Sequence, residues 1–337
     1  MPPSRIPDKI PRMSEPSETL IPRDLQPESA DVAYDLDKTL TSIVSLRANI
    51  PDDAFTASVL GTERAGHGVL INDTGLILTI GYLVTEADAV WIITHNGQAV
   101  PGHLVGYDYE TGFGLVQALG RLDIPAMPLG TSRTLEVGDE LVMAGFGGRE
   151  QALKVRFAER REFAGYWEYV LDEALFTSPP HPNWGGAALI GADGSLAGVG
   201  SLYIDSVVPS LPDLDGNLSV PIELLAGIVD ELQMYGRTLK PARPWLGMFA
   251  SEIDGHLVVA GMYDDAPAAR AGLEAGDVIL SVGEMQPQEL SSLFRAIWSL
   301  GPAGSTIPLR VSRDEKIHDI QVASVDRRDL WKTPDIH

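Results

Sequence analysis

Short alternations of apolar and polar residues, separated by Gly, Asp, Asn and Pro, fill the chain from about residue 41 to 232. Regularly spaced runs of this kind predict the strands of a β-sandwich or barrel. The clearest hairpin joins the runs 89–94 and 100–105, because Asn96-Gly97 between them favours a type I′ turn. The pattern therefore predicts a mostly β domain over this stretch.

Helical spacing is found at two places. Val32, Leu36 and Leu40 lie four apart, which predicts a short helix from Asp31 before a first strand over 41–48. A second, amphipathic helix is predicted over 287–300. Its apolar positions share one side: Leu290, Leu293, Phe294 and Ile297.

The ends of the chain differ in composition from its middle. Residues 1–30 contain many prolines among charged residues and serines, so we expect an extended arm without a core of its own. Ile6, Ile10, Leu20 and Ile21 could anchor this arm to a neighbouring surface. The tail over 327–337 is polar, with Trp331 as its one candidate anchor.

The charge and composition exclude several functions. The formal net charge of −22 opposes binding to nucleic acid or to an anionic membrane. The absence of cysteine removes disulfides, thiolate nucleophiles and cysteine metal sites, and no histidine pair has the spacing of metal ligands, so we expect neither metal nor cofactor. No apolar run could serve as an export signal or a membrane span, which predicts a cytoplasmic protein.

Five motifs occur in an order that resembles one family. They are Gly66-His67-Gly68-Val69-Leu70-Ile71 with Gly75-Leu76-Ile77-Leu78-Thr79, then Asp108-Tyr109-Glu110-Thr111-Gly112-Phe113-Gly114-Leu115, then His181-Pro182-Asn183-Trp184-Gly185-Gly186, then Asp193-Gly194, and then Ser219-Val220-Pro221-Ile222-Glu223. This series resembles the HtrA/DegP-type trypsin-like serine proteases over residues 35–235. The resemblance implies a trypsin-like double β-barrel.

A second module follows the linker 240–244. Trp245-Leu246-Gly247-Met248 resembles the carboxylate-binding loop of a PDZ domain, and residues 265–282 resemble the core of that domain. The expected fold class is therefore mostly β, a trypsin-like double β-barrel followed by an α+β PDZ domain. The expected division is an arm over 1–30, a trypsin-like domain over 31–238, a PDZ domain over 239–326 and a tail over 327–337.

The resemblance does not extend to the catalytic groups. Tyr82, Gly112 and Trp184 stand where the family has its catalytic His, Asp and Ser. A phenol cannot act as a base near neutral pH, glycine has no side chain to orient one, and an indole has no oxygen nucleophile. Pro182 also replaces a glycine whose N–H would serve the oxyanion hole. The sequence thus predicts a pseudo-protease.

A relocated catalytic site is the competing interpretation. The histidines and serines that could form one are His67, His95, His103, His181, Ser178 and Ser195. Of these, His181 beside Pro182 is the best candidate, against the plainer interpretation of a turn histidine on the rim of the cleft. Tyr82 and Trp184 either fill the former catalytic cleft or leave Trp184 exposed for a partner chain.

Peptide binding is the function that remains. By resemblance to PDZ domains, an extended peptide would add to a sheet edge and its C-terminal carboxylate would bind backbone N–H groups. The expected peptide-binding residues are Trp245, Leu246, Gly247, Met248, Leu290, Phe294 and Ile297. Alternatively, the chain itself closes the loop and Phe294 fills the pocket. An open groove would favour apolar C-terminal residues on its ligand.

Three functions follow from these observations. The first is a non-catalytic scaffold that binds peptides or proteins, whose partners are protein C-termini. The second is a structural subunit of an enzyme complex with a stable partner, and the third is an endopeptidase with a relocated site. The family resemblance implies a homo-oligomer, although the Pro-rich arm gives no basis for the trimer of the relatives.

Overall fold

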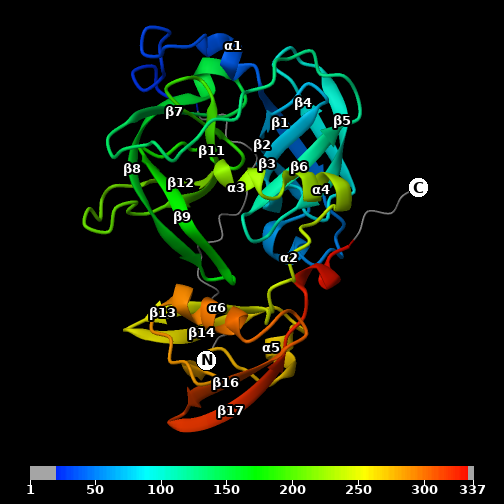
Figure 1. Cartoon of the computed structure of the whole chain (residues 1–337), viewed down its shortest axis with the longest axis vertical. Coiled ribbons are helices and arrows are strands. Elements are labelled where there is room, and N and C mark those ends of the chain that lie inside the picture. The colour runs from blue at the N-terminus through cyan, green and yellow to red at the C-terminus, as the bar shows by residue number, and fades with distance from the viewer. Residues whose placement is uncertain (1–19, 333–337) are drawn as a thin grey trace. The chain divides into compact units, whose positions relative to one another are not determined.

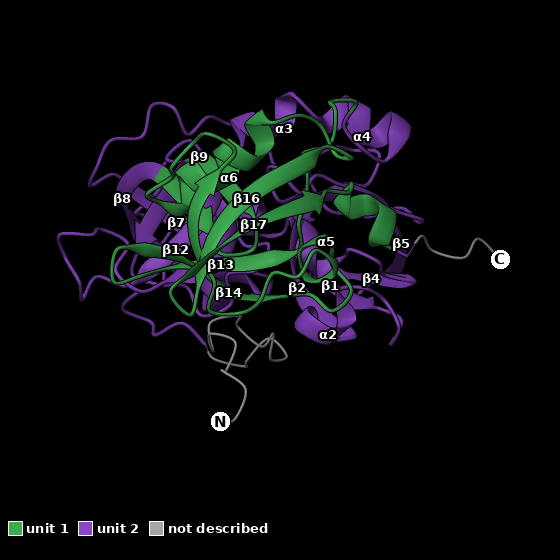
Figure 2. Ribbon diagram, turned by 90° about the horizontal axis from the view of Figure 1, so that it is seen from below, with its two compact units in different colours: residues 1–11, 162–172, 239–331 green, residues 12–161, 173–238, 332–337 purple. Residues whose placement is uncertain are grey.

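The computed structural model of the chain describes residues 20–332 (Figure 1). They form two compact units (Figure 2). Within the described residues, unit 1 consists of 162–172 and 239–331, and unit 2 consists of 20–161, 173–238 and Lys332. No helix between residues 20 and 332 has the length and apolar character to cross a membrane. Each unit has a β-sheet core of its own.

The first half of unit 2 is a closed six-stranded barrel with the order β1-β2-β3-β6-β5-β4. Its strands are β1 (Ile43–Asn49), β2 (Glu63–Leu70), β3 (Leu76–Ile80), β4 (Ala89–Ile93), β5 (Ala99–Tyr107) and β6 (Phe113–Ala118). Buried aliphatic residues such as Leu46, Ile77, Ile92 and Val116 share one hydrophobic cluster. The alternating apolar positions of the sequence therefore face the barrel interior.

The second half of unit 2 is a closed barrel with the order β10-β11-β12-β9-β8-β7, beside the first (Figure 1). Its strands are β7 (Glu140–Ala144), β8 (Ala152–Gly165), β9 (Tyr169–Ser178), β10 (Ala188–Ile190), β11 (Leu196–Ile204) and β12 (Gly216–Pro221). Strands β8 and β9 are the longest two and were not singled out by the sequence pattern. The tip of their hairpin, residues 162–172, belongs to unit 1, although the sequence placed it inside the first domain.

Short helices complete unit 2. They are α1 (Leu36–Leu40), α2 (Ala57–Leu60), η1 (Gly81–Leu83), η2 (Gly148–Gln151), α3 (Glu223–Ala226) and α4 (Val229–Tyr235). Helix α1 begins later than the predicted Asp31, because the Asp35 carboxylate caps it by accepting from the Lys38 N–H at 3.2 Å. Of the expected arm, residues 1–19 lie outside the described part. Ile21 is buried, and its N–H donates to the Glu150 carbonyl at 2.9 Å.

Unit 1 contains a five-stranded sheet in sequence order, with β13 and β17 at its edges. Its elements are β13 (Met248–Ile253), β14 (His256–Met262), α5 (Pro267–Arg270), β15 (Val278–Val282), α6 (Leu290–Ser299), β16 (Thr306–Arg313), β17 (Lys316–Ala323) and η3 (Arg327–Leu330). The sequence predicted α6 with the wider limits 287–300, and it did not indicate β17. Trp331, the expected anchor of the tail, is half-buried.

A buried arginine holds the backbone around Tyr82 in unit 2. Arg64 is only 2% exposed, and its guanidinium donates to the Tyr82 carbonyl at 2.8 Å and the Thr85 carbonyl at 3.2 Å. It also donates to the Thr56 hydroxyl at 2.7 Å, which donates in turn to the Glu86 carboxylate at 2.6 Å. Burial lowers the pKa of Arg64 to about 10, so the side chain remains charged at neutral pH.

Arg64→Met removes this cation and leaves the buried Glu86 carboxylate without compensating charge. We expect a loss of about 3–5 kcal/mol in unfolding free energy, because breaking a buried charged network is far costlier than breaking an exposed one. Urea unfolding measures it. Arg156→Met is the matched control, since its ion pair with Glu140 at 2.6 Å is exposed and worth at most about 1 kcal/mol. Equal losses in both variants would contradict the role given to Arg64.

Candidate functional site

The structure brings together the three positions that match the catalytic residues of the family. Tyr82 lies on η1 after β3, Gly112 immediately precedes β6, and Trp184 lies on the loop between β9 and β10. The Gly81 N–H donates to the Gly112 carbonyl at 2.8 Å, which places Gly112 beside the backbone of Tyr82. The Tyr82 hydroxyl also lies beside the Trp184 loop, 3.2 Å from the position of a Cβ atom added at Gly185. All three positions therefore meet at one place in unit 2.

The aromatic side chains here are packed and hydrogen-bonded. The Tyr82 hydroxyl donates to the Ser201 carbonyl at 2.8 Å. The Trp184 ring lies 5.8 Å from the Tyr203 ring, between centroids, and both Tyr82 and Trp184 are half-buried. The hypothesis that Tyr82 and Trp184 fill the former catalytic cleft stays a prediction.

None of these groups supplies hydrolytic chemistry. Burial raises the pKa of the Tyr82 phenol, so its oxygen stays protonated at neutral pH. Gly112 has φ of +86°, a left-handed conformation that an aspartate adopts only with strain. Pro182 has no N–H to offer an oxyanion.

The two histidines near this place are buried structural residues. His181 is fully buried rather than on a rim: its Nδ1 accepts from the Asn183 N–H at 3.0 Å and its Nε2 donates to the Gln151 carbonyl at 3.1 Å. The Nδ1 of His67 accepts from the Phe146 N–H at 3.0 Å. Burial, and then the neighbouring His181, lower the pKa of His67 to about 3, so it stays neutral.

The remaining candidates for a relocated site are scattered. The Ser178 hydroxyl donates to the Asp215 carbonyl at 2.8 Å, and the Ser195 hydroxyl donates to the Asp193 carboxylate at 2.5 Å. His95 and His103 are exposed. Among residues 20–332, no hydrogen bond joins either serine to a histidine, so these residues are not assembled into a nucleophile and its base.

The predicted carboxylate-binding loop in unit 1 holds a carboxylate that belongs to the chain itself. Glu168, at the tip of the β8–β9 hairpin, accepts hydrogen bonds from three consecutive backbone N–H groups. They are those of Leu246 at 3.1 Å, Gly247 at 2.7 Å and Met248 at 3.1 Å. The chain therefore closes its own loop, as one of the two interpretations of the sequence expected. The sequence did not indicate that Glu168 would be the closing group.

The loop depends on a glycine. Gly247 has φ of +75°, and a Cβ atom added there would lie 2.4 Å from the Ala266 Cβ. Trp245 does not donate to the carboxylate: its N–H donates to the Val325 carbonyl at 3.1 Å, and its ring packs 5.7 Å from that of Tyr263. Of the four expected loop residues, three contact the carboxylate and Trp245 supports them from beside the loop.

Helix α6 supplies apolar residues as expected. Phe294 and Ile297 are fully buried and Leu290 is half-buried. The same hydrophobic cluster contains Val170, two residues beyond Glu168, which is 5% exposed. The hairpin thus adds an aliphatic side chain as well as a carboxylate to unit 1.

The setting of Glu168 is apolar despite its three hydrogen bonds. Burial raises the pKa of Glu168 to about 7, while the bonds from Leu246, Met248 and Gly247 and the charge of Arg327 oppose that rise. The Glu168 carboxyl therefore titrates near neutral pH, unlike an ordinary surface glutamate.

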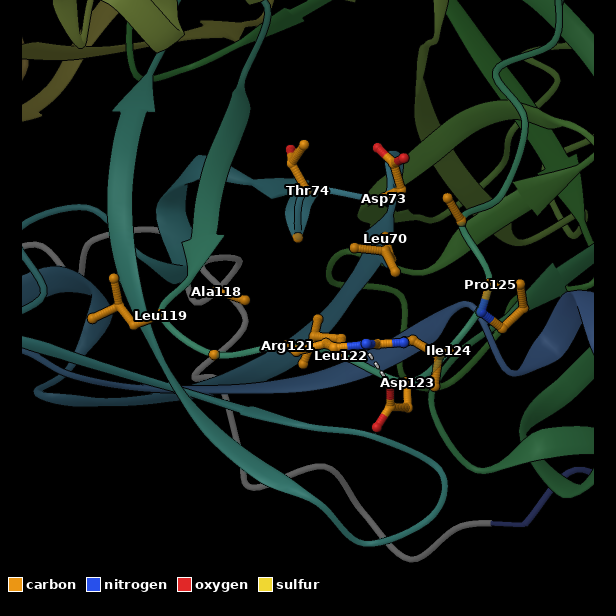
Figure 3. Close-up of a pocket in the computed structure, with 13 residues that line it drawn as sticks. Leu70, Asp73, Thr74, Ala118, Leu119, Arg121, Leu122, Asp123, Ile124 and Pro125 are labelled. Carbon is orange, nitrogen blue, oxygen red and sulfur yellow. Dashed lines mark ion pairs between the residues drawn. The ribbon is translucent and has the colours of Figure 1, made fainter.

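An open hollow of about 990 Å³ elsewhere in unit 2 offers no comparable arrangement (Figure 3). It is formed by the turn 73–75 and the segment 118–126. Its Arg121 side chain is paired with Asp123 at 2.8 Å, and both are largely exposed. The hollow contains none of the candidate catalytic or peptide-binding residues, and we assign it no function.

Comparisons with known proteins match both parts of the chain. A family described as "Trypsin-like peptidase domain" matches residues 66–199, and one described as "PDZ domain" matches residues 244–323. A "Probable periplasmic serine endoprotease DegP-like" of Pseudomonas savastanoi pv. phaseolicola is 27% identical over 278 residues, which cover 77% of this chain and 56% of the relative. The "Serine endoprotease DegS" of Salmonella typhimurium is 26% identical over 280 residues, which cover 78% of this chain and 77% of the relative. The chain thus spans little more than half the length of the DegP-like relatives.

Solved structures agree on the fold. An "HtrA-type protease AlgW with decapeptide" superimposes with a TM-score of 0.52 at 20% identity, covering 87% of this chain and 99% of the other. The serine endoprotease from Yersinia pestis gives a TM-score of 0.51 at 21% identity, covering 88% and 99%. The expected fold class, a trypsin-like double barrel followed by a PDZ domain, is confirmed.

The expected cytoplasmic location is contradicted. The DegP-like relatives from Pseudomonas savastanoi and from Halomonas elongata are both named periplasmic. The N-terminal residues of this sequence do not determine the compartment.

The sequence motifs, the pair of barrels, the five-stranded sheet and the relatives agree with one another. The chain combines an HtrA/DegP-like trypsin-type protease domain with one PDZ domain.

Proposed function

We propose that this protein is a non-catalytic HtrA-like pseudo-protease that binds the C-termini of peptides or proteins. The observation that carries the proposal is the presence of two aromatic side chains, Tyr82 and Trp184, at the matched catalytic positions, with the Tyr82 hydroxyl donating to the Ser201 carbonyl. Three groups must act as a unit in a serine protease. Here two of their places hold aromatic side chains, of which Tyr82 donates to the Ser201 carbonyl, and the third, Gly112, has no side chain.

The PDZ domain supports the binding part of the proposal. Its loop presents three N–H groups that already hold one carboxylate, which is the contact a peptide terminus would make. Strand β13 is an edge strand of the sheet and can accept an extended segment. Protein or peptide C-termini are therefore the proposed partners, and the protein is proposed to act as a scaffold in a homo-oligomer.

A structural subunit of an enzyme complex is the second candidate. It is favoured by one observation, the occupation of the carboxylate loop by Glu168, since a permanently filled groove would bind no free peptide. Purification of the untagged protein from native extract separates the two: one stoichiometric partner favours the subunit, and several peptide termini favour the scaffold.

The pure protein is expected to leave casein intact. Any background cleavage should be unchanged by a serine-directed covalent inhibitor, because no serine among residues 20–332 is hydrogen-bonded to a histidine base. Fluorescent casein measures the rate, with a catalytically active HtrA-type protease as positive control. Cleavage that the inhibitor abolishes would refute the proposal, and its persistence in Ser178→Ala and His181→Ala variants would place the nucleophile elsewhere.

Trp184→Ser is expected to reduce stability without creating activity. The new hydroxyl would have no base, because the matched position of the base holds the Tyr82 phenol, while the loss of the indole removes its packing against Tyr203. We expect a loss of about 1–3 kcal/mol in unfolding free energy, measured in urea. Trp91→Ser is the matched control, because Trp91 is 47% exposed and should cost less. A Trp184→Ser variant that cleaves casein would show that the surrounding residues still support catalysis.

A further inference from the structure

We propose that the tip of the β8–β9 hairpin is a built-in ligand of the PDZ groove, with the Glu168 side chain in place of a chain terminus, and that a partner ending in Tyr-Xaa-aliphatic displaces it. This inference rests on the proposed peptide-binding function and specifies its ligand and its regulation. The contacts that carry it all lie within unit 1.

The hairpin segment contacts β13 as an added strand would. The Ala250 N–H donates to the Tyr166 carbonyl at 3.0 Å. Met248 lies two residues before Ala250 on β13, and Glu168 lies two residues after Tyr166. The Met248 N–H donates to the Glu168 carboxylate at 3.1 Å. The first pair is a backbone hydrogen bond and the second runs through the Glu168 side chain, and both fit an antiparallel alignment of the hairpin segment with the edge strand, as in β-augmentation.

The backbone turns away at the position where a free peptide would end. Glu168 has φ of +61°, an uncommon conformation for a residue other than glycine. The turn lets the chain continue into β9 while the carboxylate of the side chain enters the loop. A side-chain carboxylate thereby receives the three N–H bonds that a C-terminal carboxylate would receive.

Side chains on both sides of the turn complete the resemblance to a bound peptide. The Tyr166 ring lies 5.8 Å from the Phe249 ring in an edge-on arrangement. Val170 is buried in the cluster that contains Phe294 and Ile297 of α6. The built-in ligand therefore combines a tyrosine, a carboxylate two residues later and an aliphatic side chain.

An arginine of α6 holds both strands of the hairpin. Arg295 pairs with Glu162 before the turn and with Asp172 after it, each at 2.5 Å. Both pairs are partly exposed, so they contribute little individually and weaken with salt. The hairpin is thus fixed by a buried carboxylate at its tip and by weaker ion pairs at its sides, an arrangement that a competing ligand can open stepwise.

The ligand class follows from this arrangement. A chain that ends opposite Met248 would place its own carboxylate on the three N–H groups and its residue two positions earlier against Phe249. A terminal aliphatic residue would replace Val170. Because the hairpin is part of the same chain, it competes as a tethered ligand. The apparent affinity of the peptide is its intrinsic affinity multiplied by the fraction of time the groove is free.

The experiment uses the full chain and a short fluorescent peptide ending in Tyr-Gly-Val, with either a free or an amidated C-terminus. In the unmodified protein, the amide hydrogens of Leu246, Gly247 and Met248 should exchange slowly without peptide. In Glu168→Ala they should exchange faster, and added free-carboxylate peptide should slow them again. Peptide affinity should be about tenfold higher in Glu168→Ala than in the unmodified protein. The amidated peptide should bind neither the unmodified protein nor Glu168→Ala.

Three further variants control for folding, for charge and for the ion pairs at the sides of the hairpin. Glu168→Gln keeps the shape of the side chain and should show a smaller gain in peptide affinity than Glu168→Ala. It tests the same contact if Glu168→Ala fails to fold. Glu173→Ala removes an exposed carboxylate of the same hairpin and should change neither exchange nor affinity. Arg295→Ala should raise affinity less than Glu168→Ala, because its ion pairs are partly exposed.

The outcomes separate this inference from the function on which it rests. Equal amide exchange and equal peptide affinity with and without Glu168 would overturn the built-in ligand while leaving peptide binding intact. Exposed amides in Glu168→Ala with no peptide bound by any variant would contradict the peptide-binding function itself and make the hairpin a permanent plug.

Discussion

The capture of one carboxylate by three successive backbone N–H groups organises unit 1. Glu168 is buried, so its charge has lost most of its hydration, and the Leu246-Gly247-Met248 backbone supplies the compensating dipoles. Those N–H groups point at one place only because Gly247 adopts a left-handed conformation with no room for a Cβ atom. The Ala250 N–H bond to the Tyr166 carbonyl and the burial of Val170 accompany this contact in the same hairpin tip.

The trypsin-like unit depends on a different kind of contact. At the matched catalytic positions, hydrogen bonds and aromatic packing replace the groups that would exchange protons. Arg64 supports this arrangement by donating to the Tyr82 carbonyl within a buried network that includes Glu86. The trypsin-like backbone scaffold is therefore retained, and its interior around Tyr82 is stabilised by this buried hydrogen-bond network.

Much of the fold could be predicted from the sequence because its signals are local. Turn residues such as Asn96-Gly97 and the alternation of apolar positions define the barrels strand by strand, and the spacing of Phe294 and Ile297 defines α6. The matched positions Tyr82, Gly112 and Trp184 could be identified because short motifs surround them. Their proximity, however, depends on how the barrels bring distant segments together.

The role of Glu168 could not be predicted in this way. It is one of 47 acidic residues, and its function depends on a loop almost eighty positions later in the chain. The local signal was weak: a glutamate within the aromatic run Tyr166-Trp167-Glu168-Tyr169 marks a turn without indicating what the turn contacts. His181 shows the converse, since its place beside Pro182 suggested chemistry while its hydrogen bonds are structural.

The most direct test of this account is the pH titration of three amide protons by nuclear magnetic resonance, with selective nitrogen labelling of Leu246, Gly247 and Met248. Ionisation of the carboxylate they contact should move all three resonances together, with one midpoint at the Glu168 pKa of about 7. The same resonances should not titrate in Glu168→Gln. Three independent or absent transitions, or a shared transition that survives in Glu168→Gln, would show that the loop does not hold this carboxylate.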